Sequence, residues 1–235
     1  MFINKDYIFV LTKYASRGAN FLIVFLITFL IEESLASQWT LDWSIFRILF
    51  PMFTFGQEIL YYSQEEKNNQ LDYLFFLIIL GLVISIGTFL FLDPRFSSIV
   101  IANVLLGCIR LNGMLIRNSN INKSVFLEDL LPALLLLIST FLYIYLNIGY
   151  FTSLSLVSGI TFILIVIQNN LAGKLKFSTD KFLKHLYGFY PIVFSGIFAS
   201  MGYFNRFFIE YQLGSNALIQ YQILFQTFLI IPIFI

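Results

Sequence analysis

The stretch GFYPIVFSGIFASMGYFNRFFIEYQLGSNALIQY, residues 188–221, decides the fold that we predict for this chain. It is a long apolar run with Pro191 near its start and Asn205-Arg206 where the predicted helix ends. A turn at Gly214-Ser215-Asn216 then leads into another apolar helix. Long apolar helices joined by short polar turns are typical of proteins that cross a membrane several times.

A similar pattern occurs earlier in the chain and indicates an internal repeat. A shift of 178 residues superimposes two apolar helix ends, each with a glutamate and, a few residues later, a serine. The superimposed segments are 29–32 with 207–210, 35–37 with 213–215, and Trp43 with Tyr221. Repeats of such long period are typical of transporters built from two related lobes. Chance similarity between apolar sequences is the alternative explanation.

The composition indicates that the solvent of this chain is lipid. Of its 235 residues, 59% are hydrophobic and only 11% are charged, whereas soluble domains carry roughly 25% charged residues. The net charge of +1 gives no basic field for nucleic acid. One cysteine, Cys108, and one histidine, His185, exclude a disulfide framework and a Cys- or His-based metal cluster within the chain. We therefore expect no metal and no cofactor.

Eight segments are apolar over about 20 residues, as membrane-spanning helices require. They are residues 14–31, 41–62, 73–92, 96–117, 130–146, 151–171, 186–205 and 218–235. Asn147-Ile148-Gly149 divides one uncharged run into a hairpin of the fifth and sixth helices. The predicted fold class is an all-α integral membrane protein, a polytopic helix bundle. The last segment stops inside an apolar helix, so we expect the chain to be the N-terminal portion of a longer protein.

The basic residues predict the orientation and the division into lobes. Every lysine and arginine except Arg47, Arg95 and Arg206 falls at the N-terminus or on even-numbered connections, which places the N-terminus in the cytoplasm. Residues 1–173 form a predicted N-terminal lobe of six transmembrane helices, and residues 174–187 form a basic cytoplasmic linker. Residues 188–235 begin a second lobe in a parallel repeat, with a seventh helix and an incomplete eighth.

Polar side chains inside the spans are the candidates for a substrate cavity, because a charge in hydrocarbon costs about 2.5–3.5 kcal/mol and usually faces a cavity or a partner. Arg47, Thr54 and Glu58 of the second span share one helical face. They either line a cavity or lie near helix ends, where their side chains reach water. Asn103 and Arg110 of the fourth span also share a face, and we favour a cavity-facing Arg110.

The seventh and first spans add further candidates. Ser195 and Arg206 lie on one face with small residues, which either pack against another helix or leave room for a bulky ligand. Asn205, next to Arg206, is a weaker candidate for the cavity. Arg17 in the first span is either a cytoplasmic anchor or part of the cavity. Arginines suit phosphate or pyrophosphate because the planar guanidinium donates two parallel hydrogen bonds. A cation exporter would need carboxylates in the middle of its spans, and Glu58, near the cytoplasmic end of its span, is the only acid that could qualify.

At these residues the chain resembles the polysaccharide flippases of the multidrug/oligosaccharidyl-lipid/polysaccharide exporter superfamily. The likeness is carried by Pro191, the Asn205-Arg206 pair, the Leu213-Gly214 turn and Tyr221. The family commonly has Asp-Arg where this chain has Asn205-Arg206, so the asparagine departs from its pattern. Residues 14–43 are similar more loosely.

The resemblance implies two six-helix lobes around a partly basic cavity that opens alternately to either side of the membrane. It implies an undecaprenyl-pyrophosphate-linked oligosaccharide as substrate, moved across the inner (cytoplasmic) membrane of a bacterial or archaeal cell for O-antigen or capsule biosynthesis. Arg47, Arg110 and Arg206 would be the basic residues of the cavity. A coupling ion, H⁺ or Na⁺, and polysaccharide assembly proteins are the other partners that it implies, beside the lipid bilayer.

Three other functions stay open at this point. A drug/cation antiporter of the same fold would carry coupling carboxylates in the first or seventh span. A membrane enzyme of polysaccharide assembly, such as a polymerase or acyltransferase, would carry a large outward loop or catalytic acid and histidine groups. The outward connections are short, and His185 is predicted to be cytoplasmic. A scaffold that transports nothing is the third alternative. We therefore expect a transporter and not an enzyme.

Overall fold

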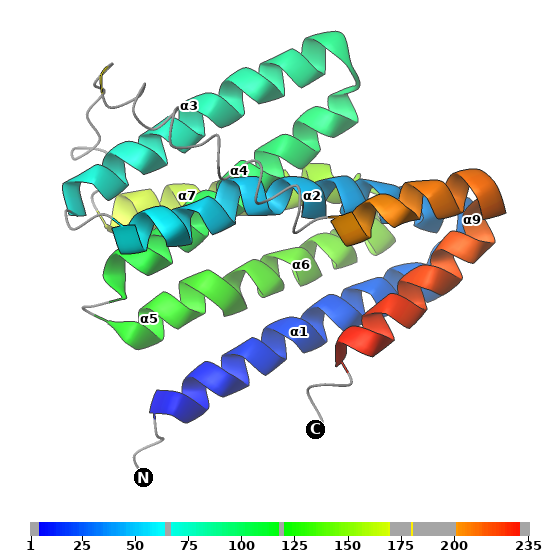
Figure 1. Ribbon diagram of the computed structural model, residues 1–235, viewed down its shortest axis with the longest axis horizontal. Helices are drawn as coiled ribbons and strands as arrows, with labels where there is room; N and C mark the ends of the chain where they lie inside the picture. Colours follow the sequence, from blue (N-terminus) through cyan, green and yellow to red (C-terminus); the bar gives the residue numbers. More distant parts are fainter. Residues whose placement is uncertain (1–4, 64–66, 118–119, 170–179, 181–200, 231–235) are drawn as a thin grey trace.

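The computed structural model describes residues 5–63, 67–117, 120–169, 180 and 201–230, and the regular structure in these ranges is helical throughout (Figure 1). The elements are α1 (Lys5–Leu30), α2 (Glu33–Ser63), α3 (Lys67–Phe91), α4 (Pro94–Ile116), α5 (Ile121–Val125), a π-helical turn η1 (Phe126–Leu130), α6 (Leu131–Leu146), α7 (Tyr150–Gln168) and α9 (Met201–Ile230). Helix α4 packs against α2, α3 and α7, whereas α9 packs against α1 and α2. The predicted all-α class is therefore confirmed. The division into two lobes stays a prediction, since the linker falls almost wholly outside these ranges.

Two of the sharpest turns depend on residues that the sequence places there. The side chain of Asp93 caps α4 by accepting a hydrogen bond of 2.8 Å from the backbone N–H of Arg95. Pro94 is the first residue of α4, a position whose backbone N–H would make no hydrogen bond within the helix. Asn147 ends α6 in the left-handed conformation, with a φ of 54°. The next helix begins three residues later, so the predicted hairpin between α6 and α7 is confirmed.

The fifth predicted helix begins nine residues earlier than residue 130, at Ile121, so the sequence-based start was wrong. Asn120 caps this earlier start by accepting a backbone hydrogen bond. The helix then widens into the π-helical turn η1. Pro132 follows this turn and has no N–H to donate to the carbonyl group of Glu128, which favours the wider turn. The extension carries Glu128 into the bundle.

Helix α9 corrects the expected end of the seventh span. Asn205 and Arg206 do not end a helix, because the helix continues to Gly214, where a φ of 81° bends the chain back on itself. The predicted turn at Gly214 is thus confirmed, and it separates two arms of α9 (orange and red in Figure 1). Under the 178-residue shift Gly214 corresponds to Ala36, which lies inside α2. The turn that follows α1 lies earlier than the position equivalent to Gly214. The two copies of the predicted repeat therefore end their first helix at different positions.

The lengths and side chains of several helices suit a membrane. Four helices in the described part of the chain are long and apolar enough to cross one: Val10–Leu30, Pro94–Ile116, Ile121–Leu146 and Tyr150–Gln168. They correspond to the first, fourth, fifth and sixth predicted spans. The exterior carries large apolar residues such as Val83, Phe89, Phe141, Leu156 and Ile163. The interior contains Asn103, Asn112, Glu128, Arg206 and Gln222. Large apolar side chains on the exterior, with a few buried polar groups within an apolar core, suit a lipid environment.

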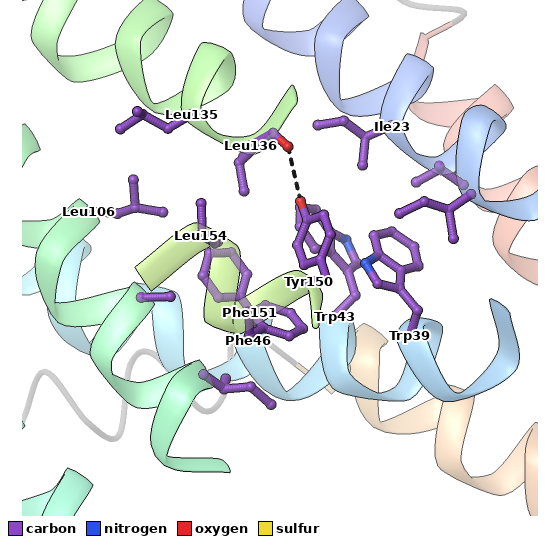
Figure 2. Packing of buried hydrophobic residues seen from close by; sticks show 14 of the residues in the cluster. Ile23, Trp39, Trp43, Phe46, Leu106, Leu135, Leu136, Tyr150, Phe151 and Leu154 are labelled. Atoms are coloured by element: carbon purple, nitrogen blue, oxygen red, sulfur yellow. Dashed lines mark hydrogen bonds between the residues drawn. The ribbon is translucent and has the colours of Figure 1, made fainter. Parts of the chain in front are cut away.

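An aromatic cluster forms the centre of the core (Figure 2). The rings of Trp39 and Trp43 stack at 5.1 Å, and Trp43 stacks on Phe46 at 5.3 Å. Tyr150 meets both tryptophans edge to face, and its hydroxyl donates to the carbonyl oxygen of Leu136 at 3.5 Å. The cluster joins α2 to α6 and α7 and so holds one face of α2 rigidly in the bundle.

A glycine lets α3 approach α4, and we expect its substitution to destabilise the protein. A Cβ on Gly81 would overlap the side chain of Val104, lying 2.8 Å from its Cγ1 atom. Gly81→Ala should therefore lower the free energy of unfolding by about 1–3 kcal/mol, as overpacking does. Gly87→Ala on the same helix is the matched control, because a Cβ there meets nothing within 4 Å. Thermal unfolding in detergent measures both, and equal midpoints would contradict the close contact.

Candidate functional site

A cavity of about 110 Å³ lies where α1, α2 and α4 meet η1 and α6. Its lining residues are Ser16, Asn20, Phe46, Arg47, Phe50, Leu106, Arg110, Glu128, Asp129, Pro132, Ala133 and Leu136. The structure therefore brings together two of the predicted residues, Arg47 and Arg110, although they come from different helices. Polar and charged groups from four elements converge here inside an otherwise apolar bundle.

Each arginine of this cavity is positioned by an aromatic ring on α2. The guanidinium carbon of Arg47 lies 4.7 Å from the ring centre of Trp43, and that of Arg110 lies 5.5 Å from the ring centre of Phe50. The Nη2 atom of Arg47 also donates a hydrogen bond of 2.8 Å to Oδ1 of Asn20 on α1. Cation–π contacts stabilise a guanidinium against the face of an aromatic ring and fix its orientation.

Acidic residues of η1 form the opposite wall of the cavity. Glu128 is 5% exposed and forms an ion pair with Arg117 at the end of α4, while Ser124 donates a hydrogen bond to the same carboxylate. Gly113 permits this approach, because a Cβ there would lie 2.7 Å from Cγ of Glu128. Glu128 and Asp42 are both buried, although neither was predicted as a site residue.

Arg206 lies in a second polar cluster, between α9 and α2, and does not line the cavity. It is fully buried, and its Nη1 atom donates a hydrogen bond of 3.1 Å to the hydroxyl group of Ser44. Its guanidinium carbon lies 4.5 Å from the ring centre of Tyr203 and 5.1 Å from that of Phe225. The Nε and Nη2 atoms are buried and make no hydrogen bond with the described residues. Unpaired buried donors of this kind are costly, so they mark a place where a polar ligand or water is favoured.

One face of α2 connects the cavity with the Arg206 cluster. Ser44 binds Arg206 of α9, and one helical turn later Arg47 binds Asn20 of α1. Gln222 on the second arm of α9 is also fully buried, and its amide oxygen and nitrogen have no hydrogen-bond partner among the described residues. Helices α1 and α9 therefore each bring a polar group to this interior stripe on α2.

The other predicted residues lie apart from this stripe or are not described. Asn103 is fully buried in α4, and its amide nitrogen donates to the carbonyl group of Ile99 in its own helix. Arg17 and Asn205 are exposed. Thr54 and Glu58 belong to α2, but their side chains lie outside the described ones, and Ser195 lies outside the described residues altogether.

Sequence reasoning missed Asn20 as a ligand of Arg47 and Glu128 as a wall of the cavity. Asn20 is a single polar residue in a largely apolar segment, which by itself does not indicate a partner. Glu128 had a signal: it stands among apolar residues directly before a predicted span, with an arginine eleven positions earlier. The wrong start of the fifth helix hid this signal, since it placed the glutamate in a connection.

No protein-family model, no curated protein and no solved structure matches this chain. The molecule itself supports a coarser description, which is an α-helical chain with several helices fit to cross a membrane. Within the described residues, no group of three or more histidine, cysteine, aspartate or glutamate side chains is placed to hold a metal ion. The interior stripe on α2, with the hydrogen bonds of Arg206 and Arg47, is the feature that bears on a specific function.

Proposed function

We propose that this chain is a membrane transporter for a lipid-linked oligosaccharide with an anionic pyrophosphate head, moved across a cytoplasmic membrane by alternating access. The observation that carries the proposal is the pair Arg47 and Arg110, which two helices bring to one cavity. The buried Arg206 adds a third guanidinium along the same face of α2. The resemblance to polysaccharide flippases points to the same substrate class.

The chemistry of the interior suits this cargo. A pyrophosphate head cannot enter hydrocarbon without compensating charge, and guanidinium groups pair with phosphate oxygens through two parallel hydrogen bonds. The apolar exterior leaves the lipid tail in the bilayer while the head moves. Such transport forms and breaks no covalent bond, so residues that bind and release are sufficient.

The size of the cavity indicates that the helices around it must move. About 110 Å³ is far below the roughly 300–1,000 Å³ of pockets that hold drug-sized ligands. A pyrophosphate with its first sugar therefore fits only after α1 or the η1–α6 helix separates from α2 and α4. A motion of one helix group against another is the usual basis of alternating access.

A cation antiporter is the second candidate, and the acidic wall of the cavity favours it. Buried carboxylates inside membrane proteins commonly mark ion pathways. Here Glu128 is already paired with Arg117 and bonded by Ser124. Asp129 is half-buried and lines the same cavity. The lining holds two arginines and two acids, so transport measurements decide between the two candidates.

The proposal is tested with the full chain in sealed vesicles. We expect a fluorescent undecaprenyl-pyrophosphate oligosaccharide to move between leaflets faster than in protein-free vesicles, as measured by its loss of protection from an external quencher. In parallel, vesicles loaded with ethidium receive an imposed proton or sodium gradient. Accelerated movement of the lipid without ethidium release supports the proposal. Ethidium movement without lipid movement would establish the antiporter in its place.

A further inference from the structure

A larger cavity of about 400 Å³ lies at the end of the bundle where α2, α4 and α7 begin. It is formed by the beginnings of α2, α4 and α7 and the end of α6, close to the turns that Asp93 and Asn147 make. Its volume falls within the range of about 300–1,000 Å³ that is typical of ligand pockets. It shares no lining residue with the arginine cavity.

One wall of this cavity is aromatic. Trp39 and Tyr150 are 3% and 4% exposed, and their rings meet edge to face at 5.6 Å (Figure 2). Tyr143 meets Tyr150 in the same way at 6.1 Å. The indole N–H of Trp39 is buried and has no hydrogen-bond partner among the described residues. A rigid aromatic wall with an unused donor suits a ligand that has both an apolar face and polar edges.

The rest of the lining combines hydrogen-bond donors and acceptors with no net charge. Asp42 is 7% exposed and forms an ion pair of 3.4 Å with Nε of Arg95, whose side chain is 38% exposed. The hydroxyl groups of Ser98 and Thr152 lie 3.5 Å apart at the same cavity, and the exposed side chain of Gln38 completes the polar lining. A cation would meet the arginine and an anion would meet the aspartate. Hydroxyl groups satisfy both, because each one donates and accepts.

We propose that this cavity binds a neutral pyranose ring, with the apolar face of the sugar against the half-buried ring of Tyr143 and its hydroxyl groups shared between Asp42 and Arg95. The proposal of a sugar site is supported by the lining residues of the cavity alone. That the ring belongs to the transported oligosaccharide rests on the proposed function. The site would then hold the sugar in a cavity separate from the arginine cavity that receives the pyrophosphate.

The chain carries its own reporter for this site. Its only two tryptophans are Trp39, which lines the cavity, and Trp43, which stacks on it. The full chain is held in an amphipathic polymer free of sugar, because maltoside detergents would occupy the site. Methyl glycosides of glucose, galactose and N-acetylglucosamine are then titrated while tryptophan fluorescence is recorded. We expect a saturable change with at least one of them.

Variants separate this site from general effects on folding. Asp42→Asn should weaken the saturable response about tenfold, because it removes a charged acceptor worth roughly one factor of ten in affinity. Thr152→Phe places a ring in the cavity from an exposed position and should abolish the response. Asp93→Asn is the matched control, because this exposed aspartate caps α4 outside the cavity and asparagine caps equally well. Elution on gel filtration shows which variants stay folded.

The outcomes distinguish this proposal from the proposed function. Loss of the response in Thr152→Phe with full response in Asp93→Asn supports the sugar site. A folded wild-type chain that responds to none of the three glycosides overturns it, and so does an unchanged response in Thr152→Phe. A saturable response to choline instead of sugars overturns it in favour of a cation site. Lipid transport without any sugar response leaves the transporter standing and removes only the sugar site, whereas a sugar response without transport does the reverse.

Discussion

Replacing Arg110 with alanine is expected to slow transport of the pyrophosphate-linked oligosaccharide by about a hundredfold, or about 2.8 kcal/mol. The guanidinium lines the interior cavity beside Arg47 and is positioned by the ring of Phe50. Removing one partner of a desolvated charge pair typically costs about 2–5 kcal/mol. The rate of lipid movement in sealed vesicles measures the effect, at protein levels matched by quantitative blotting.

Two further variants define what the cavity requires. Arg110→Lys keeps the charge but loses the planar fork, so we expect an intermediate rate. Arg17→Ala is the matched control, since this arginine is exposed on α1 and lies outside the cavity. A wild-type rate in Arg110→Ala at equal protein level would remove the cavity from the transport path. A loss in Arg17→Ala as large as that in Arg110→Ala would show that the effect is not specific to the cavity.

The second large effect is expected from Trp43→Ala, which should lower the free energy of unfolding by about 4 kcal/mol. The side chain is fully buried and stacks on Trp39 and Phe46. Its removal leaves a hole between α2 and α7 that rigid neighbours fill only in part. Unfolding by sodium dodecyl sulfate in mixed micelles, followed by circular dichroism, measures the loss.

The controls for this variant separate packing from the loss of any aromatic ring. Phe89→Ala removes a ring from the apolar exterior, where it is 58% exposed, and should change stability by less than about 1 kcal/mol. Trp43→Phe keeps a ring beneath the Arg47 guanidinium and should recover part of the stability and most of the transport rate. Equal stabilities for Trp43→Ala and Phe89→Ala would contradict the packing of α2 that Figure 2 shows.

The arginine cavity illustrates which contacts a sequence reveals and which it conceals. Arg47 and Arg110 were predictable as candidates, because a charge within an apolar span is costly and stands out by itself. Their common cavity was not predictable, because helical periodicity gives the face of each helix but not the neighbour that the face meets. The contact of Arg47 with Asn20 joins α1 and α2, which are consecutive in sequence, yet nothing local required it.

The same limit explains the misplaced helix ends. Asn205-Arg206 reads as a helix end when only hydropathy is considered, but Arg206 is buried against Ser44, Tyr203 and Phe225, so the helix continues around it. Contacts with Ser44 and two aromatic rings thus stabilise the guanidinium of Arg206 inside the bundle, whereas the hydropathy pattern alone predicted that the helix ends at this charge. Gly214 was predicted correctly because its positive φ is a local property of glycine.

By itself the sequence determined that this protein is α-helical, that its exterior suits lipid, and that its hairpin at Asn147 and turn at Gly214 lie where they do. These features follow from composition, apolar periodicity and the conformational preferences of single residues, which are local in the chain. Only the tertiary structure decided that Arg110 and Arg47 line one cavity with an acidic wall, and that Arg206 is enclosed by α2 and α9. It also placed Asp42 and Arg95 beside Trp39 in one cavity. Such contacts depend on how helices far apart in sequence pack, and packing is decided by the shapes of all the side chains together.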